Sequence, residues 1–535
     1  MKTEQKPGWR PWLAVWAAVA LLAVLSIALR AGGGTQKLYV NEDATWHVLH
    51  TMESYDGIPA AEHRFLPLVT QDDDARGVVW GATVPDENGL FYYTSFWPLG
   101  FVVPWLFAKL TGLAALPGTL YALNAVLYAA SAVLLALAMA RLFRGRLNPC
   151  LAALCAAGLY LFQPEIMQSQ GWVYWHHGLN QVFLLAQFYC FACFDKRAGK
   201  IGFFVLSLLT PFVEYTGFVA NGGYCLALLC FGPPPWGEGA GPRPRPAFVK
   251  HRLLPALGAG LLTAAAGAAT LLHYGQKLPL DKVWRAMTQS YAARGDAGNP
   301  LVQLAAMYFR SFRWLWLVLA LLAVAVLVMP GARRALPEVF KAYWKWLAVA
   351  VFPMLENLIL RQHTMEYSYA RMKGILPLTV LFLMLACCLW QAGGIGKTAQ
   401  KPGWQKAVAG ALAALVLLGG AAGLLQYLAV PNRYVEVIDY KDENAALAAG
   451  VLAAYPREDC FYGFNLPTRG YTNHLWAGGV MELCEAADTI AEAKGRGKPY
   501  AVQLAGEWAT SNTYRFTEAV VYDAQSGAVL ARFAA

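Results

Sequence analysis

Two adjacent carboxylates, Glu42 and Asp43, follow shortly after the first long apolar run of the chain. A carboxylate beside an acceptor hydroxyl can take its proton, and general-base catalysis of this kind typically speeds a reaction ~100- to 10,000-fold. The same pair also suits helix capping. Asn41 would be the N-cap, and both acids would lie in the first turn of a helix running to Met52, where the helix dipole favours negative charge. The residue types alone leave both roles open.

Cations and aromatic side chains form a second group of candidates. Arg371 and Lys373 stand close together in a short polar segment, which also contains His363 and Tyr367. Arg285 supplies a further cation from another polar segment. Cations placed where a phosphate leaves would stabilise the developing negative charge, which is often a large catalytic term. Anchoring at the membrane interface is the alternative role for Arg371 and Lys373.

His176 and His177 open an apolar run beside three aromatic residues. Such a cluster is typical of an interfacial aromatic belt, and it is also a candidate for binding a polar headgroup. The two histidines lack the spaced set of Cys, His and carboxylate ligands that a metal site needs, so we predict no metal site there. The run Asp72 to Asp74 could hold a divalent ion or form a solvated turn. No other cofactor is expected.

A membrane protein must position these residues. Hydrophobic residues make up 57% of the 535 positions and charged residues 14%, with mean hydropathy +0.38. Soluble domains use roughly 45–50% apolar and about 25% charged residues. The net charge of +10 would suit nucleic acid, but the Lys and Arg residues lie mainly in short clusters between apolar runs, as the positive-inside rule expects. We therefore predict an all-α polytopic membrane protein rather than a nucleic-acid-binding one.

Apolar stretches that could cross a bilayer of ~30 Å, or half-cross it as paired short helices, begin at about eleven places. They start near Trp12, Leu120, Cys150, Leu179, Ile201, Thr216, Leu253, Trp314, Trp344, Ile375 and Ala407. The first run is longer than the ~7–15 residues of a signal-peptide core and has no small-residue cleavage site behind it. We expect an uncleaved first span with a cytoplasmic N-terminus.

Two segments decide this count. Pro98 to Gly112 is apolar but short, and as a span it would invert every later basic cluster, so we expect it to lie in the interface. Ile201 to Phe231 could be one long helix, but a break around Pro211 and Glu214 keeps the following basic cluster on the cytoplasmic side. We therefore predict two short helices there.

The chain is expected to divide into a membrane domain, 1–430, with a large acidic external loop, 31–118, and an external α/β domain, 431–535. Two further external segments are His273 to Arg310 and Arg361 to Gly374. In the last domain we predict helices over Asn444 to Tyr455 and Ala486 to Lys494, strands over Cys460 to Phe464 and Tyr500 to Leu504, and a hairpin of Phe516 to Asp523 with Ala528 to Phe533.

Cysteine use is consistent with this division. Cys460 and Cys484 are the only pair in the polar C-terminal region, and the other cysteines lie within or at the ends of apolar runs. If the C-terminal domain lies outside the cytoplasm, a disulfide between these two residues is chemically permitted.

The order of these features resembles the GT-C superfamily of membrane glycosyltransferases, in particular the branch with protein O-mannosyltransferases and the aminoarabinose transferases of lipid A. The features are the first span, the acidic pair, the sequence Tyr92-Tyr93-Thr94-Ser95-Phe96-Trp97-Pro98-Leu99-Gly100, a short interfacial helix, and a span closed by the basic cluster around Arg144. The detailed resemblance runs from about Trp12 to Phe194, and hydropathy continues it beyond.

The resemblance implies transfer of a sugar from a polyprenyl-phosphate donor to a glycan, lipid or protein acceptor on the outer face of a bacterial plasma membrane. Its acidic pair aligns in two registers, so Asp43 or Glu42 would be the base. An arginine usual at the outer end of the second span is missing, with Ala122 and Asn124 in that neighbourhood. Arg371 or Lys373 would then take over its phosphate contact.

Two other classes stay open. A transporter or flippase of a lipid-linked glycan would share the spans and cationic patches, but such proteins usually hold ionisable residues at the bilayer midplane and often have repeated halves. Glu356 is the clearest acid inside a predicted span. A non-catalytic sensor or scaffold would leave the acidic loop unexplained.

Overall fold

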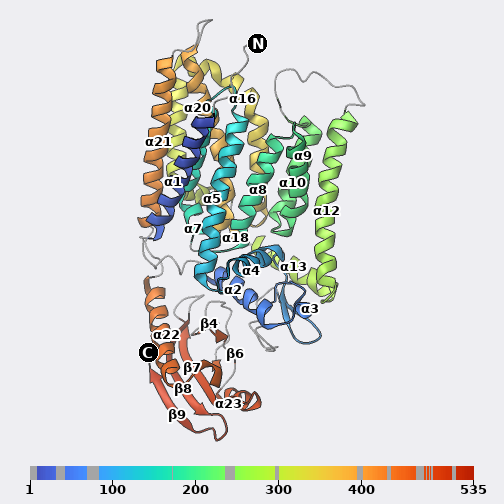
Figure 1. Cartoon of the computed structure of the whole chain (residues 1–535), viewed down its shortest axis with the longest axis vertical. Helices are drawn as coiled ribbons and strands as arrows, with labels where there is room; N and C mark the ends of the chain where they lie inside the picture. Colours follow the sequence, from blue (N-terminus) through green and yellow to red (C-terminus); the bar gives the residue numbers. More distant parts are fainter. Residues whose placement is uncertain are drawn as a thin grey trace. The chain divides into compact units, whose positions relative to one another are not determined.

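The computed structural model is mostly helical and divides into two units (Figure 1). It describes residues 9–31, 42–68, 83–171, 173–234, 236, 248–295, 301–394, 402–429, 435–464, 475–476, 479–480, 482–483, 486–508 and 514–534. The first unit contains Met1–Gly34, Tyr121–Leu272 and Tyr291–Val430. The second contains Thr35–Leu120, His273–Ser290 and Pro431–Ala535.

Long apolar helices dominate the first unit. Its main helices are α1 (Trp9–Ala31), α5 (Pro117–Leu142), α6 (Pro149–Leu161), α8 (His176–Ala192), α9 (Arg197–Leu209), α10 (Thr216–Phe231), α12 (Leu254–Gly275), α14 (Leu301–Ser311), α15 (Arg313–Val328), α16 (Pro330–Val351), α20 (Ile375–Gln391) and α21 (Pro402–Ala429). Within the described residues, five helices are long and apolar enough to cross a membrane, or six if the bent pair α14 and α15 counts as one span. The chain is therefore mostly helical with several candidate membrane spans, as is typical of a membrane protein, and the other predicted spans fall in shorter or more polar helices.

The predicted break in Ile201 to Phe231 is confirmed. Helix α9 ends at Leu209, a single 3₁₀ turn (η2, Thr210–Phe212) follows, and α10 begins at Thr216. Pro211 causes the break because it has no N–H to donate and its ring clashes with the preceding turn.

One predicted start differs from the structure. The apolar run near Trp344 is the second half of α16, which begins at Pro330 and contains several charged residues in its first half. Pro330 is at the favoured first position of a helix. The helix ends at Val351 and passes into a 3₁₀ turn, η4 (Phe352–Leu355), because Pro353 cannot continue the helical hydrogen bonds.

In the second unit, the acidic loop folds as α2 (Glu42–Gly57), α3 (Ala60–His63), an antiparallel pair β1 (Thr83–Pro85) and β2 (Phe91–Tyr93), and α4 (Leu99–Thr111). Helix α4 is too short to cross a bilayer alone. It packs on α2, where the Asp56 carboxylate accepts from Trp105 Nε1 at 2.9 Å and pairs with Lys109 Nζ at 2.7 Å. Its interfacial placement stays a prediction.

A second segment of the chain joins this loop. The Tyr274 hydroxyl donates to the carbonyl oxygens of Tyr93 at 2.9 Å and Phe96 at 3.2 Å. The His273 ring lies 2.7 Å from the Arg64 carbonyl oxygen. Helix α13 (Leu280–Gly295) follows, and the Ser95 hydroxyl donates a hydrogen bond to the Ser290 hydroxyl at 2.9 Å. These hydrogen bonds bring together two segments that the charge pattern predicts to be external.

The C-terminal residues form the predicted α/β domain. Its elements are α22 (Val435–Ala454), η7 (Arg457–Asp459), β3 (Cys460–Phe464), β4 (Leu475–Trp476), β5 (Gly479–Val480), β6 (Glu482–Leu483), α23 (Ala486–Gly495), β7 (Tyr500–Trp508), β8 (Tyr514–Asp523) and β9 (Val529–Ala534). The sheet order is β6-β3-β7-β8-β9. Strand β3 is parallel to β6 and β7, and β7-β8 and β8-β9 are antiparallel.

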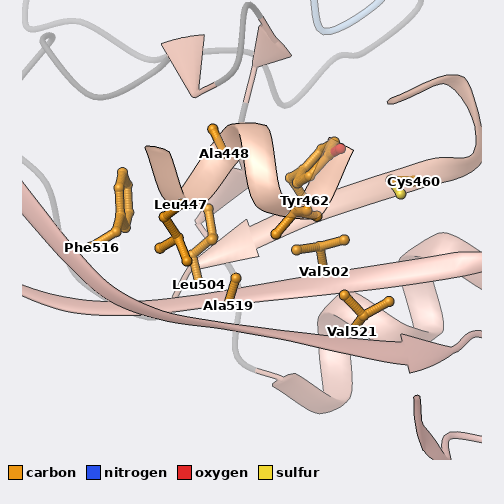
Figure 2. Packing of buried hydrophobic residues seen from close by; sticks show 10 residues of the cluster. Leu447, Ala448, Cys460, Tyr462, Val502, Leu504, Phe516, Ala519 and Val521 are labelled. Carbon is orange, nitrogen blue, oxygen red and sulfur yellow. The ribbon is translucent and has the colours of Figure 1, made fainter. Parts of the chain in front are cut away.

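Alternation of side chains along the strands builds the two faces of this sheet. One face packs against α22, and Figure 2 shows Leu447 and Ala448 of this helix over Val502 and Leu504. Residues one step along the strands, including Ala501, form a smaller core with α23. The sheet is thus covered by a helix on each face.

Candidate functional site

The candidate site lies in the first unit, near the C-terminal end of α1. Arg30, in the last turn of α1, donates to the carbonyl oxygens of Met167 at 2.9 Å and Gln170 at 3.2 Å. Met167 belongs to the short helix α7 (Pro164–Ser169). Figure 1 shows α7 and α18 (Arg361–Glu366) at this end of the helical unit. The chain here also forms α17 (Glu356–Ile359), α19 (Ser368–Arg371) and the 3₁₀ turn η5 (Met372–Gly374).

A buried ion pair joins α7 to α19. Arg371 Nη2 lies 3.2 Å from Glu165 Oε1, and its Nε donates to the Ser311 hydroxyl at 2.8 Å. Its Nη1 donates to the carbonyl oxygens of Thr364 at 2.6 Å and Met365 at 3.0 Å. The planar guanidinium suits this fan of acceptors. Arg371 therefore ties three segments together, and its charge is balanced by Glu165.

A second buried pair joins η5 to α17. Lys373 Nζ pairs with Glu356 Oε2 and donates to the Thr216 hydroxyl at 2.9 Å. The Thr216 hydroxyl in turn donates to the same Glu356 oxygen. The side chains of Lys373 and Glu356 are 3% and 2% exposed. An ammonium and a carboxylate this deeply buried are retained only as partners, because either alone would be strongly destabilising.

The third element is a histidine and carboxylate pair. His177 Nε2, in the first turn of α8, lies 2.9 Å from Glu214 Oε1, and Asn180 Nδ2 donates to Glu214 Oε2 at 2.7 Å. His363 Nε2 approaches His177 Nε2 at 3.4 Å. One of the two facing nitrogens must donate and the other accept, since imidazole nitrogens differ in protonation. His177 Nε2 carries at most one proton and faces both Glu214 Oε1 and His363 Nε2, so the shorter contact, with the carboxylate, is the one that takes this proton and orients the ring.

Aromatic rings surround the histidines. The ring of Tyr369 packs on His177 with centroids 4.8 Å apart, and Tyr367 stacks on Tyr369 at 5.0 Å. The Tyr367 ring also lies 4.8 Å from that of His363. His176 is buried with the edge of its ring against Trp175 at 4.3 Å. These rings exclude water from the charged groups, which strengthens the electrostatic interactions between them.

The structure thus gathers five of the predicted site residues, listed as His177, His363, Tyr367, Arg371 and Lys373. Arg285 belongs to the second unit, where it is exposed on α13. Glu42 and Asp43 open α2, as the capping interpretation predicts, and the helix runs past the predicted Met52 to Gly57; their side chains lie outside the described residues, so the catalytic role stays a prediction. Asp72 to Asp74 also lie outside them.

Sequence reasoning missed part of this cluster. It took Glu214 only as a helix break, and it did not single out Glu165 or Asn180. The available signal was the isolated acid within an apolar segment, which in a membrane protein marks a functional site by default. The partners themselves carry no such signal, because they come from distant parts of the chain.

Further groups lie outside this cluster. Among the described residues, no set of three His, Cys, Asp or Glu side chains could hold a metal ion. Cys460 is buried with a free thiol, and Cys484, its partner in the predicted disulfide, lies outside the described residues. Burial raises the pKa of the Cys460 thiol to about 11, which makes it a poor nucleophile.

No protein-family model matches the chain, and no functionally curated protein matches its sequence.

Proposed function

We propose that this chain is a membrane glycosyltransferase that moves a sugar from a polyprenyl-phosphate donor to a glycan, lipid or protein acceptor. We place the reaction on the outer face of a bacterial plasma membrane, with the N-terminus in the cytoplasm and the C-terminal domain outside. The shorter helices, α6 and α8 to α10 among them, would complete about eleven spans. The order of motifs along the chain and the fold class support this proposal.

The observation that carries the proposal is the cluster of ionisable residues at the helix ends of the first unit. Glu214 is held by His177 and Asn180, and Glu356 by Lys373 and Thr216. Transfer from a lipid phosphate needs charged and proton-transferring groups in fixed positions, because preorganised charge needs no rearrangement during the reaction. Packing and hydrogen bonds provide that preorganisation here.

The cations have a more limited role in this arrangement than the sequence predicts. Arg371 and Lys373 are each balanced by a buried carboxylate. A phosphate contact by either cation would require it to share its charge with Glu165 or Glu356. We therefore propose that Arg371 and Lys373 mainly position the surrounding segments, and that either would contact a phosphate only by sharing its charge in this way.

Amide substitutions in the acidic pair test the proposal. Asp43→Asn and Glu42→Gln keep the size of the side chain but remove its ability to accept a proton. Loss of the base should lower transfer ~100-fold or more in membranes supplied with donor and acceptor. A capping role predicts nearly unchanged transfer, because amides cap helices about as well as carboxylates.

Asp56→Asn is the matched control, because Asp56 lies on the same helix and its half-exposed pair with Lys109 is worth little. Full transfer by both acidic-pair variants, in protein that inserts normally, would refute the assignment of the base.

A transporter of a lipid-linked glycan is the second candidate. The sequence pointed to few acids within spans, whereas the described residues include three buried carboxylates in the helical unit, which favours this candidate. Glu165, Glu214 and Glu356 are all buried in the helical unit and paired with basic side chains. Ionisable groups inside a membrane unit commonly mark transport pathways. Lipid translocation by reconstituted protein, without any sugar transfer, would select this function.

A further inference from the structure

The junction of α14 and α15 is a sharp bend, which we call the elbow. The two helix axes meet at 85° at Ser311 and Phe312. Gln163 Nε2 donates to the Ser311 carbonyl oxygen at 2.7 Å, and Arg371 Nε donates to the Ser311 hydroxyl at 2.8 Å. Gln426 Nε2 donates to the Arg310 carbonyl oxygen at 3.2 Å. The elbow is therefore held from three other segments.

An open groove of about 590 Å³ lies at this elbow. Its lining consists of two small residues, two aromatic residues and two arginines, namely Ala305, Ala306, Phe309, Trp316, Arg310 and Arg313. Both arginines are exposed, and neither side chain forms a salt bridge or hydrogen bond with another residue in the described ranges. The lining contains no carboxylate. The groove thus combines an apolar wall with uncompensated positive charge.

The surroundings of the groove point to the bilayer. Val302 on α14 is 77% exposed and Leu317 on α15 is 62% exposed, so both helices present apolar side chains outward. A strongly amphipathic helix at a right angle to an apolar span is expected to lie in the plane of the membrane interface. The elbow is then at the depth of the lipid headgroups, where aromatic residues such as Trp316 are enriched.

We propose that this elbow binds an anionic phospholipid, with its phosphate between Arg310 and Arg313 and its chains along the apolar wall. The guanidinium group matches phosphate geometry with paired N–H donors. A groove of this volume falls in the ~300–1,000 Å³ range of ligand sites. The lining offers no acid, base or hydroxyl to act on a sugar, so the site binds a structural lipid and does not carry out transfer. The inference stands independently of the proposed function.

Lipid retention by the purified full-length protein tests this site. The protein is exposed to equimolar phosphatidylglycerol and phosphatidylcholine, and the bound lipids are counted by native mass spectrometry. Arg310→Gln with Arg313→Gln should lower the preference for phosphatidylglycerol about 25-fold, since each basic residue near an anionic surface contributes about fivefold. Ala306→Trp, which fills the groove without changing charge, should lower retention of phosphatidylglycerol to a similar level.

Arg333→Gln with Arg334→Gln is the matched control, because these residues are also exposed and adjacent to an apolar span but do not line the groove. This control should keep the preference. An equal loss in both double variants would overturn the proposal in favour of general surface charge. A second result would also overturn the proposal and make the groove a donor site. In that case stoichiometric polyprenyl phosphate would displace phosphatidylglycerol, and Arg310→Gln with Arg313→Gln would raise the KM for the donor.

Discussion

The buried pair of Lys373 and Glu356 gives the sharpest prediction about stability. Glu356→Gln keeps the shape of the side chain but leaves the Lys373 ammonium without its counter-charge in a site where both side chains are at most 3% exposed. The Thr216 hydroxyl would remain as a neutral partner. Removing one partner of a buried pair costs about 3–5 kcal/mol. We expect the variant to lose that amount of unfolding free energy.

The double variant separates pairing from packing. Replacing both residues, with Glu356→Gln and Lys373→Met, removes both charges, and such replacements are often neutral or stabilising for buried pairs. It should therefore be more stable than Glu356→Gln alone. Asp56→Asn is the surface control and should cost at most about 1 kcal/mol, because its pair is roughly half exposed.

Unfolding of the full-length protein in mixed micelles, followed by size-exclusion fluorescence and by denaturant titration, measures all three variants. The reasoning is refuted if Glu356→Gln costs no more than the surface control, or if the double variant is as unstable as the single one. Either result would mean that the carboxylate does not balance the charge of Lys373.

Three further predictions concern other parts of the chain. A reporter fused after Ala535 should be extracytoplasmic and one inserted within 232–246 cytoplasmic, because basic residues flank that loop; the reverse result at either point would change the span count. Burial lowers the pKa of His63, so its imidazolium is disfavoured in the folded state. Stability of the surrounding segment should fall as the pH drops below the unfolded value of ~6.5, and hydrogen exchange of residues 42–68 should lose most of this dependence in His63→Gln. Leu504→Ala, at a fully buried position, should cost about 2–5 kcal/mol, whereas Leu530→Ala, 46% exposed, should cost under about 0.5 kcal/mol, as measured by hydrogen exchange of the C-terminal domain.

The C-terminal domain was largely predictable because its central strands are short apolar runs bounded by turn residues. Strand β3 has the predicted bounds, and β7 begins at the predicted residue, Tyr500. Each has a face toward α22 and a face toward α23, so apolar residues continue along both faces and the strand is recognisable over five or more residues. Strands β4, β5 and β6 have two residues each, which is too short for any periodicity.

In the helical unit, hydropathy located helices but not always their ends. It placed the start of α20 correctly at Ile375, after the turn η5. It missed the first half of α16, since the charged residues after Pro330 lower the local hydropathy while the backbone remains helical. Hydropathy reports the environment of the side chains, and caps and prolines report where the backbone hydrogen bonds begin and end.

The ion pairs could not be predicted from spacing. Arg371 and Glu165 are 206 residues apart in the sequence, and only the fold brings α7 beside α19. Neither residue belongs to a local motif whose geometry a helix or turn would fix. For Arg310 and Arg313 the spacing in the sequence is short and easily seen. The 85° bend that places both residues at one groove could not be predicted from the sequence.

The burial of the carboxylates favours the transporter candidate, but the way in which they are paired is an argument for the transferase proposal. A carrier that alternates between two faces must exchange the partners of its ionisable groups, whereas a transferase must keep its charges in place. Glu214 has partners on one helix, His177 and Asn180, and both of its carboxylate oxygens are engaged. Rigid-body motion of α8 would carry both partners away together and leave the carboxylate buried alone, at a large energetic cost. The 3.4 Å approach of His363 to the same His177 nitrogen is longer than the 2.9 Å contact of that nitrogen with Glu214, so the carboxylate is the main partner of His177. The pairing of Glu214 with one helix is therefore an argument for our transferase proposal over the transporter, and the translocation assay named above would decide between them.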